Sequence, residues 1–122
     1  KGRRSGVRKM IVRKLIKSGC NVNAQDNSGH SALMVACYQG KKDVVKELLK
    51  VNAKLNLKLK QYNVTALIMA STTGQVEIVK MLIKKGAALN VRDSSNLTAL
   101  GYAIQRGQTQ VVKILKKAGA KK

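Results

Sequence analysis

Few side chains in this sequence could take part in catalysis. There is one histidine, His30, and the two cysteines, Cys20 and Cys37, lack the C-x-x-C spacing of zinc and redox sites. The acidic residues are widely spaced along the chain: Asp26, Asp43, Glu47, Glu77 and Asp93. Catalysis requires titratable groups that converge, and the sequence contains no recognisable triad, metal-binding cluster or phosphate-binding glycine loop. We therefore predict a non-catalytic protein without a metal or a cofactor.

Charge is the most unusual property of the chain. Its 25 lysines and arginines outnumber five acidic residues and give a formal net charge of +20 at pH 7. Such a chain attracts polyanions and repels itself, whether or not polyanion binding is its function. The charge is therefore compatible with a partner that is a nucleic acid or an anionic surface, but it does not by itself establish one.

Length and composition indicate one folded domain, residues 1–122, in which 44% of the residues are hydrophobic and only 2% are aromatic. A core of aliphatic side chains and alanine suits closely packed helices. No apolar segment approaches the roughly 20 residues that span a bilayer, and no signal peptide opens the chain. Two cysteines without a disulfide pattern fit a reducing compartment. We expect an intracellular monomer, in the cytoplasm or the nucleus.

The elements that must position any binding residues repeat along the chain. Residues 31–33, 65–67 and 98–100 read Ser-Ala-Leu, Thr-Ala-Leu and Thr-Ala-Leu, at steps of 34 and 33 residues. A glycine follows each motif: Gly40, Gly74 and Gly107. Apolar doublets with helical spacing come next in every copy: Val44, Val45, Leu48 and Leu49; Ile78, Val79, Leu82 and Ile83; Val111, Val112 and Leu115. Each copy is therefore predicted to contain two helices.

Local signals mark where these helices begin and end. The Ser or Thr of each motif is a suitable N-cap for the first helix, and the following glycine can adopt the left-handed conformation that ends it. The second helices are expected to end at glycine or at its usual substitute, asparagine: Gly19, Asn52, Gly86 and Gly119. An extended loop then leads to the next copy.

This pattern resembles the ankyrin repeat, whose consensus contains G-x-T-P-L-H-x-A-A and E-I-V-K-L-L-L-x-x-G-A. Residues 26–58, 59–92 and 93–122 match whole repeats, the last with capping character, and residues 1–25 match a partial N-terminal repeat. The resemblance implies an all-α solenoid of stacked helix-turn-helix units joined by short hairpin loops. It also puts Cys20 and Cys37 at alanine positions of the family, where a packed core thiol is expected.

The sequence departs from the family pattern at several positions. The histidine of the consensus is replaced by Met34, Ile68 and Gly101, which removes a polar contact between repeats. Lys60 stands for the hairpin aspartate, and one extra residue precedes Thr65, so we expect that hairpin to deviate. Asp43 and Glu47 are expected on the lysine-rich side of a helix, paired with nearby lysines.

The resemblance also implies a binding surface, the concave side formed by hairpin tips and the exposed side of the first helices. Position by position, the candidate residues are Asn27, Ser28, His30, Tyr38, Gln39, Gln61, Tyr62, Val64, Thr72, Thr73, Ser94, Ser95, Leu97, Gln105 and Arg106. Only Arg106 among them is basic. The predicted function is therefore binding of another protein. An acidic partner is favoured, because the positive charge of the chain would attract it at long range.

An alternative function follows from the lysines of the second helices, which form the convex side. They could bind nucleic acid or an anionic lipid surface, with Lys41, Lys42, Lys46, Lys50, Lys80, Lys84, Lys113 and Lys117 as the candidate residues. A third possibility is an engineered, supercharged ankyrin scaffold without a native function.

Overall fold

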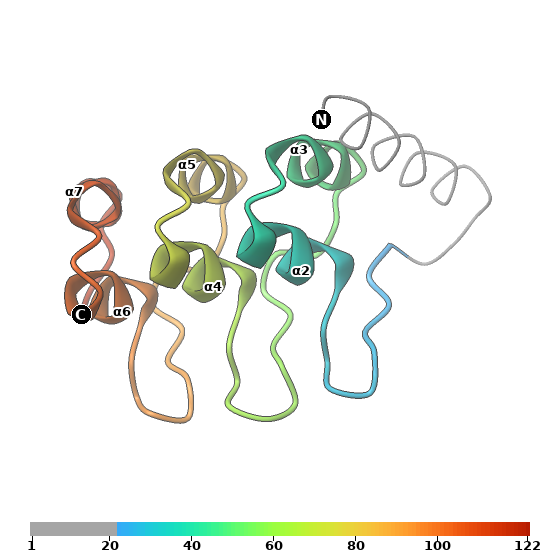
Figure 1. Ribbon diagram of the computed structural model, residues 1–122, viewed down its shortest axis with the longest axis horizontal. Helices are drawn as coiled ribbons and strands as arrows, with labels where there is room; N and C mark the ends of the chain where they lie inside the picture. Colours follow the sequence, from blue (N-terminus) through green and yellow to red (C-terminus); the bar gives the residue numbers. More distant parts are fainter. Residues whose placement is uncertain (1–21) are drawn as a thin grey trace.

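The computed structural model describes residues 22–122. Within them, three helix pairs follow one another: α2 (Ala32–Gln39) and α3 (Lys42–Lys50), α4 (Ala66–Thr73) and α5 (Val76–Lys84), α6 (Ala99–Gln105) and α7 (Thr109–Lys117). Figure 1 shows the first helices α2, α4 and α6 in one row and the second helices α3, α5 and α7 in another, with the hairpin loops projecting beyond the first helices. The predicted all-α repeat architecture is confirmed. Cys20, Gly19 and nearly all of the expected partial repeat, residues 1–25, lie outside the described residues.

The first helices begin and end at the predicted residues. Ser31 Oγ accepts a hydrogen bond from the Met34 amide at 3.2 Å, and Thr65 Oγ1 accepts one from the Ile68 amide at 3.3 Å. The equivalent bond in α6 joins the Gly101 amide to Thr98 Oγ1 at 3.1 Å. These hydroxyls satisfy amides that have no partner within the helix. Beyond α2 and α4 the chain turns at Gly40 and Gly74, with φ of 72° and 73°.

The second helices are amphipathic, and they connect neighbouring repeats. Asn52 follows α3 with a φ of 58°, as expected for asparagine in the place of glycine. At the start of α7, Gln108 Nε2 donates a hydrogen bond to the Thr72 carbonyl oxygen of the preceding repeat at 3.1 Å. A polar side chain at the start of a second helix therefore helps to fix the stacking of repeats.

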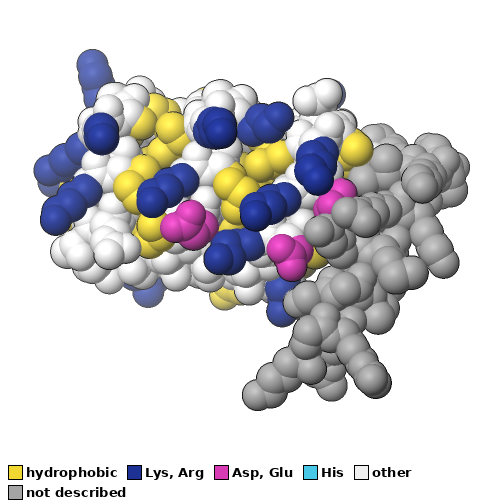
Figure 2. Space-filling model, turned by 90° about the horizontal axis from the view of Figure 1, so that it is seen from above, with side chains coloured by type: hydrophobic (Ala, Val, Ile, Leu, Met, Phe, Trp, Pro, Cys, Tyr) yellow, Lys and Arg dark blue, Asp and Glu magenta, His cyan; other side chains and the backbone are white. Residues whose placement is uncertain are grey.

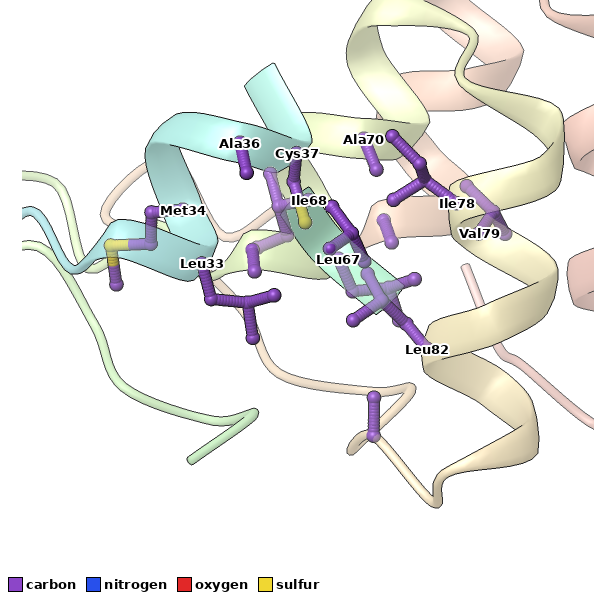
Figure 3. Packing of buried hydrophobic residues seen from close by; sticks show 14 of the residues in the cluster. Leu33, Met34, Ala36, Cys37, Leu67, Ile68, Ala70, Ile78, Val79 and Leu82 are labelled. Carbon is purple, nitrogen blue, oxygen red and sulfur yellow. The ribbon is translucent and has the colours of Figure 1, made fainter. Parts of the chain in front are cut away.

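The core lies between the two rows of helices and is continuous from repeat to repeat (Figure 3). Leu48, Ile78 and Leu82 are fully buried, and each such side chain contributes about 1.5–3 kcal/mol to stability. Ala36, Ala70 and Ala103 occupy one repeat position and are also buried, which lets the first helices approach closely. Cys37 is buried among them, and this burial raises the pKa of its thiol to about 12. The expected packed core thiol is confirmed for this cysteine.

Asparagines at equivalent positions join the extended loops of successive repeats. Asn23 Oδ1 accepts a hydrogen bond from the Lys54 amide at 2.7 Å. Asn56 Oδ1 accepts one from the Ala88 amide at 2.9 Å, and Asn90 Oδ1 accepts one from the Lys121 amide at 2.7 Å. These hydrogen bonds connect each repeat to the next through the extended loops, in addition to the packing of the helices.

The middle hairpin deviates, as predicted, and the extra residue lies in its tip. The Asp26 amide donates to the His30 carbonyl oxygen, and the Asp93 amide donates to that of Leu97, each at 3.0 Å. The corresponding bond of the middle hairpin joins the Leu59 amide to the Val64 carbonyl oxygen at 2.9 Å. Leu59, rather than Lys60, thus takes the place of the hairpin aspartate, which corrects the predicted alignment.

Candidate functional site

An apolar depression of about 410 Å³ lies on the exposed side of the first helices. It extends between α2 and α4 and reaches one residue of α6, and we call it the first-helix groove. Its lining residues are His30, Met34, Val35, Tyr38, Val64, Ile68, Met69, Thr72 and Tyr102. The groove combines a large apolar surface with a few polar groups, which is typical of a binding site.

The repeat itself builds this groove, because its lining residues recur at equivalent positions. Val35, Met69 and Tyr102 are separated by the same steps of 34 and 33 residues as the capping motifs. Met34 and Ile68 form another such pair and are 1% and 3% exposed. These two residues stand where the family has histidine. Their substitution gives the groove an apolar floor that a histidine would have made polar.

The rim at α2 is both apolar and exposed. Val35 and Tyr38 lie three residues apart on one side of α2 and are 40% and 62% exposed. His30 lies where the hairpin meets this helix, with Nδ1 at 3.2 Å from Asp26 Oδ2. Asp26 also accepts hydrogen bonds from the amides of His30 and Ser28, and the His30 bond is the main cause of the lowered pKa of Asp26. These bonds hold His30 at the rim.

Tyr102 closes the other end of the groove. Its hydroxyl donates a hydrogen bond to Asp93 Oδ2, and this bond is the main cause of the raised pKa of Tyr102. Asp93 is buried and accepts further hydrogen bonds from the amides of Ser95 and Leu97, at 2.9 and 3.1 Å. The last hairpin thereby fixes the position of the Tyr102 ring.

The structure brings four of the sequence-predicted binding residues together in the groove: His30, Tyr38, Val64 and Thr72. The others lie elsewhere. Exposed hairpin tips carry Asn27, Ser28, Gln61, Tyr62, Ser94 and Ser95. The exposed ends of first helices carry Gln39, Gln105 and Arg106. Leu97 is partly buried, and the Thr73 hydroxyl is used within α4, where it donates to the Met69 carbonyl oxygen at 2.8 Å.

Sequence reasoning missed five lining residues: Met34, Val35, Ile68, Met69 and Tyr102. The repeat register could have identified Val35, because it precedes Tyr38 by one helical turn on the same side. Its equivalents Met69 and Tyr102 follow at the repeat steps. For Met34 and Ile68 the sequence indicates only the loss of a polar contact between repeats.

The lysines of the second helices form a separate surface, seen from above in Figure 2. Lys42, Lys46, Lys50, Lys80, Lys84, Lys113 and Lys117 are exposed, and Lys41 is partly buried. Lys50 Nζ lies 3.8 Å from Glu47 Oε1, and Lys80 Nζ lies 3.8 Å from Glu77 Oε1. The lysine pairing predicted for Glu47 is therefore present, although this residue is only 6% exposed. It occupies the repeat position of Met81 and Ile114, which are also withdrawn from solvent.

Residues 22–122 contain no group of three or more His, Cys, Asp or Glu side chains that could hold a metal ion. None of their helices combines the length and the apolar character needed to cross a membrane.

Comparison with known families gives a match over nearly the whole sequence. A family model described as ankyrin repeats in three copies matches residues 4–93 and 56–122. Ankyrin repeats are generally protein–protein interaction modules and are typically non-catalytic. The matched ranges include every helix pair and hairpin described above, so this chain belongs to the ankyrin-repeat family.

Proposed function

We propose that this protein is a non-catalytic adaptor that binds another protein through the first-helix groove. The observation that carries the proposal is the apolar rim of the groove, formed by Val35 and Tyr38. Exposed large apolar side chains are few among the described residues: Val35, Tyr38, Tyr62 and Ile104. Two of them lie side by side on one groove, where a partner would remove them from water.

The groove suits an apolar anchor of the partner. Apolar side chains that fill a central pocket often contribute most of the binding energy of an interface. Met34 and Met69 can adapt their shape to such an anchor because methionine is unbranched and flexible. Thr72 adds little polarity, since its hydroxyl donates to the Ile68 carbonyl oxygen at 2.8 Å. We therefore propose a partner segment with one or two large apolar side chains.

Polar residues on the hairpin tips, outside the groove, would provide further, adaptable hydrogen bonds to the partner. Asn27, Ser28 and Gln61 on the hairpin tips are exposed and uncharged. They resemble the small polar residues that surround aromatic anchors in other binding surfaces. The proposed setting of this interaction is the cytoplasm or the nucleus, with a monomeric adaptor.

Two tyrosines of nearly equal exposure allow a matched test. Tyr38 is 62% exposed and lines the groove, whereas Tyr62 is 60% exposed and lies on a hairpin tip outside it. Peptide ligands selected from a display library on the wild-type protein should bind the Tyr38→Ala variant at least about tenfold more weakly. The Tyr62→Ala variant should retain most of the affinity.

The opposite result would contradict the proposal. If Tyr62→Ala removed binding and Tyr38→Ala did not, the hairpin tips and not the groove would be the binding surface. Thermal unfolding of both variants would establish that each remains folded, as expected for substitutions at exposed positions.

A further inference from the structure

A second depression, of about 400 Å³, lies on the opposite row of helices, between α3 and α5. We call it the lysine groove. Its apolar residues are Leu49 and Met81, and its basic residues are Lys46, Lys50, Lys84 and Lys85. Apolar side chains thus lie between two rows of ammonium groups.

The same arrangement recurs one repeat further along the chain. Ile83 of α5 and Ile114 of α7 take the repeat positions of Leu49 and Met81, and both are partly buried. Exposed lysines of the same two helices flank them: Lys80, Lys84, Lys113 and Lys117. Figure 2 shows this pattern as apolar patches between the rows of lysines. The surface therefore alternates between positive and apolar bands across three helices.

The positive charge of this surface is poorly compensated. The helices α3, α5 and α7 with Lys41 and Lys85 hold ten lysines and three acidic residues. Among the residues that the structure describes, only Lys50 and Lys80 of these lysines have a carboxylate within 4.0 Å. Lys46, Lys84 and Lys85, which line the groove, thus present ammonium groups that a partner's carboxylates could contact.

We infer that this surface binds an acidic amphipathic helix of a partner, at a site separate from the first-helix groove. The helix crosses α3, α5 and α7, places apolar side chains in the two apolar bands and directs carboxylates to the lysines. Packed helices are about 8–10 Å apart, and a helix rises 1.5 Å per residue. The two apolar anchors of the ligand are therefore about five to seven residues apart, and the upper end of this range is the i, i+7 spacing of helix-in-groove recognition.

The residue types of this surface favour a protein ligand over a nucleic acid. The helices α3, α5 and α7 contain neither an arginine nor an aromatic residue. Arginine reads base edges and phosphates with two hydrogen bonds, and aromatic rings stack on unpaired bases. Lysines beside an apolar floor instead complement carboxylates that flank an apolar side chain.

The test uses an acetylated helical peptide of about 18 residues, with two leucines seven residues apart and glutamates along the same side. Replacement of both leucines by glutamine leaves the charge unchanged and should weaken binding at least about tenfold. In the protein, Met81→Gln should weaken binding of the leucine peptide but not of the glutamine peptide. Thermal unfolding would establish that the variant is folded.

Two double variants that remove the same amount of charge distinguish binding at the lysine groove from a general attraction to the net charge of the protein. The Lys46→Gln, Lys84→Gln variant removes two charges from the lysine groove, and the Lys54→Gln, Lys58→Gln variant removes two exposed charges from a hairpin arm. Only the first pair should weaken peptide binding at least about tenfold at 0.15 M salt, where the Debye length is about 8 Å. Equal effects of the two pairs would overturn the inference.

A single-stranded oligonucleotide and phosphatidylserine vesicles test the other polyanions. Weaker binding of both than of the leucine peptide at 0.15 M salt supports the inference. If either binds more tightly than the peptide, and Met81→Gln does not change that binding, the surface recognises negative charge alone and the inference is wrong.

Discussion

The backbone amide of Lys60 donates a hydrogen bond to the carbonyl oxygen of Ser28 at 3.1 Å, which joins the hairpins of two successive repeats. The Ser94 amide and the Tyr62 carbonyl oxygen form the next such bond, at 2.9 Å. This close approach explains the glycine at position 29. A Cβ atom there would lie only 2.7 Å from the Lys60 backbone nitrogen.

A comparison of two glycines with the same φ distinguishes the cost of disturbing this contact from the cost of backbone strain. Gly29 and Gly86 both have a φ of 92°, but a Cβ at Gly86 would meet nothing within 4 Å. Alanine at either position should cost about 1–2 kcal/mol for the left-handed conformation. Gly29→Ala should cost more than Gly86→Ala because the neighbouring backbone must also shift. Urea unfolding of the two variants measures the difference, and equal losses would mean that the hairpins are not joined at this point.

The core prediction concerns leucines that connect the two rows of helices. Leu48 and Leu82 are fully buried, so Leu48→Ala and Leu82→Ala should each lower the free energy of unfolding by about 2–5 kcal/mol. Val35→Ala, at an exposed groove position, should change it by no more than about 0.5 kcal/mol. Denaturant unfolding of the three variants tests both statements. Small losses at the leucines would place them outside the core.

The hydrogen bond between Tyr102 and Asp93 predicts a dependence on alkaline pH. It raises the pKa of Tyr102 above the value of 10.0 expected for an unfolded chain, so folding favours the neutral phenol. The stabilisation is complete below that value and is lost as pH rises through the higher folded pKa. Tyrosinate absorbance of the wild type should therefore contain a component at high pH that Tyr102→Phe removes.

The free energy of unfolding of Tyr102→Phe should also fall less than that of the wild type as pH rises into the alkaline range. The two proteins carry the same lysines, so the comparison of wild type with Tyr102→Phe isolates the tyrosine. If Tyr102→Phe removed no high-pH component from the tyrosinate absorbance and left the alkaline stability unchanged, the phenol would not be bonded to Asp93 in solution.

The predictable parts of this fold are those that neighbouring residues determine. Ser31 caps a helix through an amide three residues away, and Gly40 ends the same helix through its own backbone conformation, so both could be identified from local sequence. The apolar doublets identified the core for the same reason, since a helix repeats its sides at a fixed spacing.

Contacts between repeats were harder to predict. Val35 and Met69 lie together because two repeats stack, and neither has a sequence signal that distinguishes a groove residue from another exposed apolar residue. The burial of Glu47 was equally hard to predict, because the neighbouring Lys46 and Lys50 are exposed, whereas Glu47 has the repeat position of the partly buried Met81 and Ile114. Lys60 lies five residues before Thr65, as Asp26 lies five before Ser31, but the middle hairpin takes up its extra residue in the tip, so that Leu59 has the place of the aspartate.

The last prediction concerns the response of stability to salt. The chain carries a net charge of +20, and in residues 22–122 the only acid–base pairs within 4.0 Å are Lys50 with Glu47, Lys80 with Glu77 and His30 with Asp26. Repulsion among lysines should therefore outweigh ion pairing. The Debye length falls from about 30 Å at 0.01 M to about 8 Å at 0.15 M, so the melting temperature should rise over this range of sodium chloride concentration. Lys113→Gln with Lys117→Gln should raise the melting temperature at low salt and reduce its salt dependence, because α7 contains no acidic residue. A melting temperature that fell steadily with added salt would instead mean that attractive ion pairs dominate the surface.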